Sequence, residues 1–376
     1  GPPMIGDPLE LDAGVPEGPD TYRFHTADGV ASADAFRTAE LLLLRAVHGS
    51  DAGDHLSVQA NYGVVGVALA ASADSVRMIE SSARRARLCR RNAVANGTDA
   101  RTTVVADLRR LSGGYDTASY APESHTPVSI GKQRIADALA ALRPGGRLFV
   151  AAADGAGRSR YEDCLTELVG GYRTVTTADG CSVSVAERPA SFEPPRYVSP
   201  TRFTVHVDGT SFPLITVPGM FAAGRLDDGT RLLAESATVE DGDRVLDLCC
   251  GAGPLGVYAA TVADSSVTLT DDSRVATRAA ACSLRASSID GRVVTADGVH
   301  GVAGDRFDRV LCNPPTHAGD GVLASLLDGT RRVLRPEAEL LVVHHRELDL
   351  RPHLRGYGSV AVVNTGEEHV VVAARP

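Results

Sequence analysis

An internal repeat constrains the fold of this chain more than any other feature. The first half contains, in order, Val76–Glu80, Thr103–Asp107 and Ala121–His125. The second half contains, at matching spacing, Val267–Asp271, Val293–Asp297 and Asn313–His317. The period of about 190 residues indicates two copies of one domain, because repeats of solenoids and propellers are only roughly 20–50 residues long.

A proline-rich segment separates the two copies. Arg188–Pro200 contains four prolines, which prevent it from continuing a helix or a central strand. We therefore expect one domain over residues 1–192 and a second over 193–376. The length of 376 residues agrees with two domains of roughly 100–200 residues each.

Short β-branched segments alternate with helix-forming segments in each copy. In the second copy the expected strands are Arg244–Leu248, Val267–Thr270, Arg292–Thr295, Arg309–Leu311, Leu340–Val343, Val360–Val363 and Val370–Val372. Such alternation predicts a mostly parallel sheet with helices on both faces. Asn364–Glu368 is too short for a crossover helix, so the last two strands should form an antiparallel hairpin. The predicted fold class is α/β, with two tandem Rossmann-like domains of seven strands each.

A strand that runs into a glycine turn marks a candidate cofactor site in the second copy. Val245–Gly253 precedes a helix expected over Leu255–Val262. Gly251 and Gly253 permit a tight turn and close approach of a ligand at the end of the strand. Asp247 suits a ligand with a positive charge, such as S-adenosylmethionine, whereas an anionic pyrophosphate has no need of a carboxylate there.

Two further aspartates follow the next two expected strands. Asp271 is placed to bind two ribose hydroxyl groups, and Asp297 to bind an adenine amino group. Either one alone is more often a turn or helix cap. Three aspartates at successive strand ends after a glycine turn favour a cofactor site.

The segment Asn313-Pro314-Pro315-Thr316 follows the fourth expected strand. The side-chain oxygen of Asn313 and the carbonyl oxygen of Pro314 could accept hydrogen bonds from one amino group. This directs the nitrogen lone pair toward an electrophilic methyl group. We predict these four residues as catalytic; the alternative is a rigid turn, because Asn-Pro is common in turns.

These segments resemble motifs I to IV of class I S-adenosylmethionine-dependent methyltransferases. With Pro218–Phe221 and Leu226–Leu233 they resemble more closely the two-domain RsmC/RlmG-type ribosomal RNA guanine-N2 methyltransferases. The resemblance implies a catalytic second domain, a degenerate first domain, S-adenosyl-L-methionine as cofactor, and ribosomal RNA or a small-subunit particle as partner. It also implies that Thr230 belongs to the cofactor-binding residues. Thr316 departs from the aromatic residue that the family usually has there.

Other acceptors and functions stay open. Adenine-N6 and protein glutamine-N5 methyltransferases also use an Asn-Pro-Pro loop for a planar amino group. A non-catalytic RNA-binding factor for ribosome assembly is a further alternative, which the intact motifs of the second copy disfavour.

The first copy has lost the residues that carry the chemistry. Alignment of Gly66 with Gly256 pairs the following residues of the two copies: Ser57 with Asp247, Asn61 with Gly251, Ala121 with Asn313, and Glu123 with Pro315. Glu80 and Asp107 remain. We therefore expect the first copy neither to bind the cofactor well nor to catalyse.

A run of arginines in the first copy is a candidate RNA-binding surface. Arg84, Arg87 and Arg91 fall on one face of an expected helix, with Arg85 and Arg90 beside them. The net charge of −9 gives no general attraction to nucleic acid, so RNA affinity requires a local patch. A solvated helix that pairs with nearby acids is the alternative.

Composition limits the remaining possibilities. Seven cysteines without CxxC spacing argue against a zinc site or a disulfide framework, so we expect no metal. No apolar run approaches the roughly 18–20 residues of a membrane span. We therefore expect a cytoplasmic protein with no membrane partner, and the sequence leaves its oligomeric state open.

Overall fold

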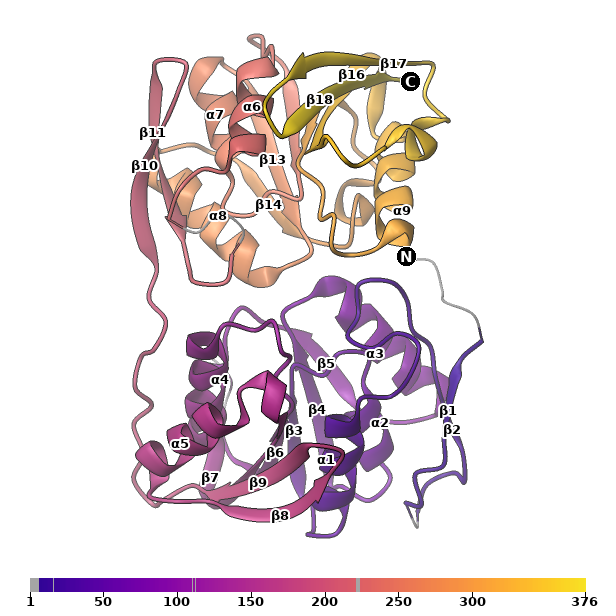
Figure 1. The fold of residues 1–376 in the computed structure, drawn as a ribbon, viewed down its shortest axis with the longest axis vertical. Coiled ribbons are helices and arrows are strands. Elements are labelled where there is room, and N and C mark those ends of the chain that lie inside the picture. Colours follow the sequence, from indigo (N-terminus) through magenta and orange to yellow (C-terminus); the bar gives the residue numbers. More distant parts are fainter. Residues whose placement is uncertain (1–6, 16, 110, 112, 221–223) are drawn as a thin grey trace. The chain divides into compact units, whose positions relative to one another are not determined.

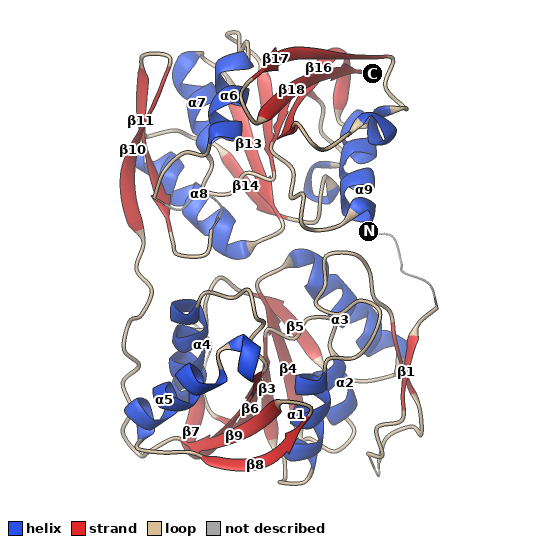
Figure 2. Ribbon diagram, in the orientation of Figure 1, coloured by secondary structure: helices blue, strands red, loops and turns tan. Residues whose placement is uncertain are grey.

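The computed structural model describes residues 7–15, 17–109, 111, 113–220 and 224–376. They form two compact units, divided between Ser199 and Pro200. The predicted boundary after residue 192 lies in the same proline-rich segment. Each unit contains a seven-stranded sheet with helices on both faces, so the predicted fold class is confirmed (Figures 1 and 2).

The sheet of the first unit has the strand order β5-β4-β3-β6-β7-β9-β8. Its strands are β3 (Asp54–Val58), β4 (Ser75–Glu80), β5 (Arg101–Val104), β6 (Tyr115–Tyr120), β7 (Leu142–Ala153), β8 (Arg173–Ala178) and β9 (Cys181–Glu187). Its helices are α1 (Thr38–His48), α2 (Val64–Leu69), α3 (Ala83–Ala95), α4 (Val128–Ala141) and α5 (Arg158–Val169), with the 3-10 turn η1 (Asp154–Ala156). A separate antiparallel pair joins β1 (Leu9–Leu11) to β2 (Tyr22–Phe24).

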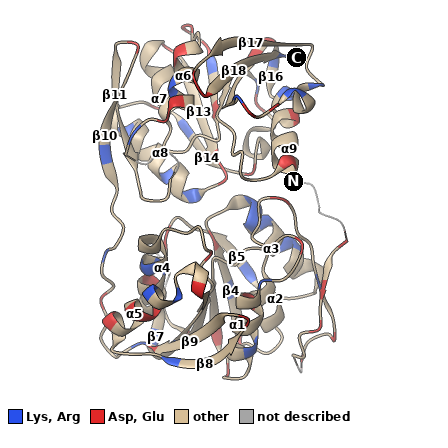
Figure 3. Cartoon of the chain, in the orientation of Figure 1, with Lys and Arg blue, Asp and Glu red and all other residues tan. Residues whose placement is uncertain are grey.

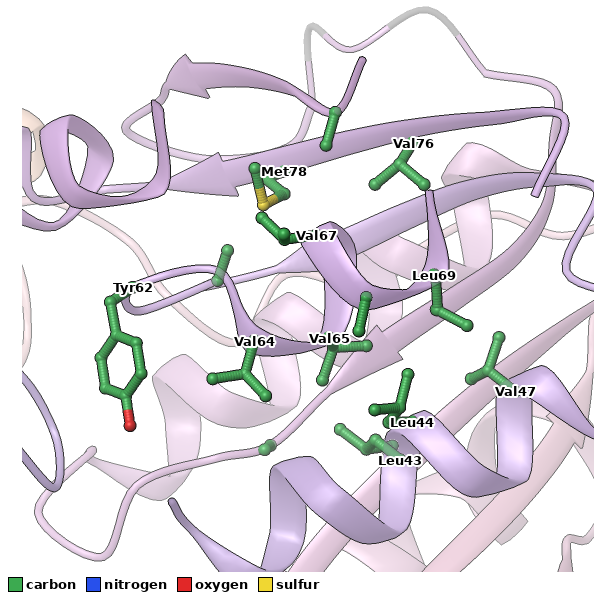
Figure 4. Packing of buried hydrophobic residues seen from close by; sticks show 14 of the residues in the cluster. Leu43, Leu44, Val47, Tyr62, Val64, Val65, Val67, Leu69, Val76 and Met78 are labelled. Carbon is green, nitrogen blue, oxygen red and sulfur yellow. The ribbon is translucent and has the colours of Figure 1, made fainter. Parts of the chain in front are cut away.

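The core of the first unit explains why α2 forms although it is apolar on all sides. Figure 4 shows Val65 of α2 facing Leu44 of α1, and Val67 facing Met78 of β4. Every residue of α2 is buried. A short helix that is apolar all round is stable only when neighbours cover every face, and here α1, α3, β3 and β4 pack around it.

The sheet of the second unit repeats this order as β14-β13-β12-β15-β16-β18-β17. Its strands are β12 (Arg244–Leu248), β13 (Ser266–Asp271), β14 (Arg292–Thr295), β15 (Phe307–Cys312), β16 (Leu334–His345), β17 (Ser359–Thr365) and β18 (His369–Arg375). Its helices are α6 (Asp228–Ser236), α7 (Pro254–Val262), α8 (Arg274–Ala286) and α9 (Asp320–Arg331), with the 3-10 turns η2 (His300–Val302) and η3 (Arg351–Leu354). All seven expected strands are present, and β17 pairs antiparallel with β18 as predicted.

Side chains of the second sheet alternate between two apolar layers. Val245, Leu269 and Leu311 pack with α7 and α8, whereas Leu246 and Val310 pack with α9. This period of two is what a sheet covered on both faces requires.

The hairpin β10 (Thr201–Val207) and β11 (Thr210–Thr216) was not expected from the sequence. It packs against α7 and α8, and the amide of Ile215 donates to Ser283 Oγ at 2.9 Å. The turn residues Asp208 and Gly209 have φ angles of +46° and +75°. An Asp-Gly pair with two positive φ angles is a strong hairpin signal, so the sequence did contain the information.

Candidate active site

A cavity of about 720 Å³ lies at the carboxyl ends of β12, β13, β15 and β16 in the second unit. The strand β12 pairs with β13 on one side and with β15 on the other, which makes this edge the topological switch point where α/β sheets bind ligands. The predicted residues that line the cavity are Thr230, Asp247, Gly251, Asp271, Asn313, Pro314, Pro315 and Thr316. Gly253 and Asp297 are not among the lining residues.

The glycine turn has the backbone that the sequence predicted. Cys249, Gly251 and Gly253 all have positive φ angles, of +60°, +55° and +89°. A Cβ atom on Gly253 would lie 2.7 Å from Leu269 Cδ2, so this glycine lets the turn pack against β13. A Cβ atom on Gly251 would meet nothing within 4 Å, so Gly251 leaves space open on the cavity side.

Asp247 offers a carboxylate oxygen without a partner. Its side chain is 1% exposed, and Oδ2 accepts a hydrogen bond from the amide of Gly256 at 2.8 Å. Its Oδ1 is buried and has no hydrogen-bond partner among the described residues. Burial, and secondarily the charge of Asp271, raises the pKa of Asp247 well above its usual value. A buried acceptor of this kind fits a positively charged donor.

Asp271 shapes the same turn. Its Oδ2 accepts from the amide of Gly251 at 2.9 Å, and its Oδ1 accepts from the amide of Ser273 at 2.8 Å. Ser273 is the N-cap of α8. Asp271 thus stabilises a turn, which was one of its alternative interpretations, while it also lines the cavity.

Asp297 follows β14 and is 7% exposed. The 3-10 turn η2 begins three residues later, and the amide of His300 donates to the carbonyl oxygen of Asp297 at 3.3 Å. Its assignment to an adenine amino group stays a prediction.

The segment after β15 places Asn313 at the cavity wall. Its Nδ2 donates to Thr230 Oγ1 at 3.0 Å and makes a longer contact of 3.5 Å with Asp227 Oδ1. The next residue, Pro314, is buried, whereas Pro315 and Thr316 are exposed. The carbonyl oxygen of Pro315 accepts from the amide of Ala318 at 3.2 Å, which closes the turn.

The structure adds residues that the sequence interpretation missed. Asp227 is the N-cap of α6 and accepts hydrogen bonds from both the amide and the hydroxyl of Thr230. An Asp three residues before Thr at the start of a helix is a recognisable capping signal. His345 and His369 also line the cavity, with ring centroids 5.6 Å apart and an interplanar angle of 72°. They are cross-strand neighbours on β16 and β18, and no sequence spacing signals that pairing.

Comparison with known proteins assigns the chain to a family. The family described as "Methyltransferase small domain" matches residues 21–184 and 211–373, which is more than half of the chain. The chain belongs to this methyltransferase family. The predicted resemblance is thereby confirmed, and both copies of the repeat are methyltransferase small domains.

Relatives and solved structures agree with this assignment. Ribosomal RNA small subunit methyltransferase C of Pseudomonas aeruginosa is 31% identical over 246 residues, which cover 63% of this chain and 73% of that protein. The enzyme of the same name from Pseudoalteromonas atlantica is 27% identical and covers 65% and 71% of the two chains. The T. thermophilus 16S rRNA N2 G1207 methyltransferase (RsmC), solved with AdoMet and guanosine, has a TM-score of 0.82 at 23% identity over 99% and 98% of the chains. This structural similarity shows that the two proteins share a fold.

In the first methyltransferase small domain, the residues that align with the cofactor and acceptor loops make hydrogen bonds within the chain. Asn61, the counterpart of Gly251, bonds to Ala31 through both atoms of its amide. The guanidinium of Arg37 donates to the carbonyl oxygens of Ala121 and Pro122 at 3.2 and 3.3 Å. These carbonyls are the counterparts of those of Asn313 and Pro314. The contacts support the prediction that this domain is degenerate.

The arginine-rich helix α3 differs from the expectation in one respect. Arg84 is 7% exposed, so it does not share an exposed face with Arg87 and Arg91. The exposed arginines of α3 are Arg87, Arg90 and Arg91. Figure 3 shows basic positions, in blue, along this helix. Arg84 is turned inward because helix positions next to apolar residues such as Leu88 face the core.

Proposed function

We propose that this methyltransferase modifies the N2 amine of a guanine in small-subunit ribosomal RNA, with S-adenosyl-L-methionine as the methyl donor. The observation that carries the proposal is one cavity that holds both Asp247 with its glycine turn and Asn313 with Pro314. The named function of the relatives from Pseudomonas and Pseudoalteromonas supports the choice of RNA as substrate.

The cavity residues fit the cofactor. The unpartnered Asp247 Oδ1 would accept from its ammonium group. The space beside Gly251 admits it close to the backbone. Asp271 lines the cavity at the end of β13, where a carboxylate oxygen can accept hydrogen bonds from the ribose hydroxyl groups. When bound, S-adenosylmethionine supplies an electrophilic methyl group.

Asn313 and Pro314 perform the positioning on the acceptor side. The two N–H groups of an exocyclic amine donate to Asn313 Oδ1 and to the carbonyl oxygen of Pro314. Both contacts stabilise the positive charge that develops on the nitrogen, and together they direct its lone pair. A base in RNA reaches such a cavity when it is unstacked or flipped from its helix.

RNA must also be held outside the cavity. The exposed arginines Arg87, Arg90 and Arg91 of α3 are candidates for phosphate contacts. Among the described residues, none of the helices combines the length and apolar character needed to span a membrane. A ribosomal substrate accords with the expected cytoplasmic location.

Methyl transfer to unmodified small ribosomal subunits tests the proposal. Purified protein is incubated with labelled S-adenosylmethionine and either subunits or naked RNA, and the labelled nucleoside is mapped. We expect N2-methylguanosine at one position. Detection of N6-methyladenosine, or of label in a protein glutamine, would show that the acceptor is not guanine, although the methyl group would still be transferred to a planar amino group. Failure to bind the cofactor at all would favour the non-catalytic RNA-binding alternative.

A further inference from the structure

Three side chains form a chain of hydrogen bonds that ends at the proposed acceptor site. Asp227 caps α6 and accepts a hydrogen bond from the hydroxyl of Thr230, with 2.7 Å between Thr230 Oγ1 and Asp227 Oδ2. Thr230 Oγ1 in turn accepts from Asn313 Nδ2 at 3.0 Å. Thr230 is 4% exposed, so water does not compete freely for these contacts.

The chemistry of the partners fixes which end of the Asn313 amide faces them. The carboxylate of Asp227 can only accept hydrogen bonds, and the single proton of the Thr230 hydroxyl is already donated to it. An amide turned by 180° would place Asn313 Oδ1 against these acceptors and leave its NH2 group pointing away. Only the observed orientation leaves Oδ1 available to a donor from the cavity.

The degenerate copy has lost all three members of this chain together. The alignment that pairs Gly66 with Gly256 places Arg37 at Asp227 and Glu40 at Thr230, and Ala121 stands at Asn313. There, Arg37 lies 3.7 Å from Glu40 Oε1 and donates to the Ala121 carbonyl instead. The first copy, which lacks the Asn313–Thr316 segment, has therefore lost all three residues together. This is expected if the three residues serve one function.

We propose that Asp227 and Thr230 are positioning residues that hold the amide of Asn313 with Oδ1 directed at the acceptor amine. This gives Thr230 a role different from the cofactor contact that the family resemblance implied. The inference rests on the proposed function only in requiring an amine acceptor, and it holds for any planar NH2 group.

Paired substitutions test the inference through activity. Thr230→Val keeps the shape and removes the hydroxyl, and we expect it to lower kcat about tenfold, the effect of one lost hydrogen bond. The Kd of the cofactor should stay unchanged. Thr230→Ser, which keeps the hydroxyl, should recover most of the rate. In an Asn313→Ala background, Thr230→Val should add no further loss.

The control is Thr330→Val, which removes a fully buried hydroxyl that bonds to the Leu326 carbonyl within α9. This variant measures how far kcat falls when a buried threonine hydroxyl is lost elsewhere in the same unit, because Thr330 does not line the cavity. Equal losses from Thr230→Val in the wild-type and Asn313→Ala backgrounds would overturn the inference. So would weakened cofactor binding, which would return Thr230 to the cofactor site.

A measurement on the protein without cofactor or RNA separates this inference from the proposed function. The chain has five asparagines, so selective 15N labelling of asparagine side chains gives five NH2 signals, and Asn313→Ala identifies one of them. We expect that signal to exchange slowly with solvent in the wild type and in Thr230→Ser, and rapidly in Thr230→Val. Unprotected Asn313 protons in the wild type would overturn the inference even if guanine methylation is demonstrated. Protected protons without RNA methylation would contradict the proposed function alone.

Discussion

At the scale of single residues, the proposed chemistry depends most on the side-chain oxygen of Asn313. Replacement by Ala removes this acceptor and keeps the two prolines that shape the turn. We expect single-turnover methyl transfer to fall by about 10²–10³-fold, the typical effect of one preorganised electrostatic contact. Calorimetry should show unchanged cofactor affinity. Asn364→Ala on β17 is the matched control, and near-normal transfer in Asn313→Ala would refute the mechanism.

Asp247 makes cofactor binding depend on pH. Burial raises the pKa of its carboxyl group in the free protein, and an adjacent ammonium group would lower it again. Binding is then favoured by the ionised form, so affinity should rise with pH until the pKa of the free protein is passed. Asp247→Asn should bind weakly and without this dependence. Titration calorimetry in buffers of different ionisation enthalpy measures the released proton; equal heats in all buffers would contradict the assignment.

At the scale of elements, α3 is the part of the first unit that can be tested for RNA contacts. The double variant Arg90→Gln/Arg91→Gln should bind RNA more weakly. The slope of log affinity against log salt should decrease by about 1.4–1.8, the value for two lost phosphate contacts. Cofactor affinity should not change. Arg160→Gln on α5, also exposed, is the control, and an unaltered salt slope would show that RNA binds elsewhere.

Helix α1 carries a buried acid that couples stability to pH. Burial raises the pKa of Glu40 to about 7, although the nearby Arg37 opposes the shift. An unfolded chain releases this proton near pH 4.5, so the stability present below that pH is lost as pH rises to about 7. Glu40→Gln should therefore raise the free energy of unfolding above pH 7 by up to about 3 kcal/mol. Urea unfolding at pH 5 and pH 8 measures this, with the exposed Glu193→Gln as control.

At the scale of the whole molecule, two copies of one fold should provide one cofactor site. The second unit has Asp247 and Gly251, whereas the first has Ser57 and Asn61 at the same positions. Calorimetry on the full chain should therefore give one S-adenosylmethionine per chain, and Asp247→Asn should remove most of that binding. A stoichiometry of two, or strong binding that survives in Asp247→Asn, would contradict the proposed division of roles.

The sequence by itself determined the duplication, the positions of the second unit's seven strands along the chain, and the loops at their carboxyl ends. Each of these depends on local patterns, such as β-branched runs, glycine turns and proline pairs, which act over a few residues. The family resemblance then supplied the cofactor and the acceptor. The hairpin β10–β11 could also have been predicted from the Asp208-Gly209 pair, but the sequence analysis did not predict it.

Only the tertiary structure decided which side chains meet. The hydrogen bond from Asn313 to Thr230 joins residues 83 positions apart, and His345 meets His369 because β16 pairs with β18. The inward orientation of Arg84 likewise depends on what covers its face of α3. Such contacts depend on how the helices and strands pack against one another, so the spacing of residues along the chain does not predict them.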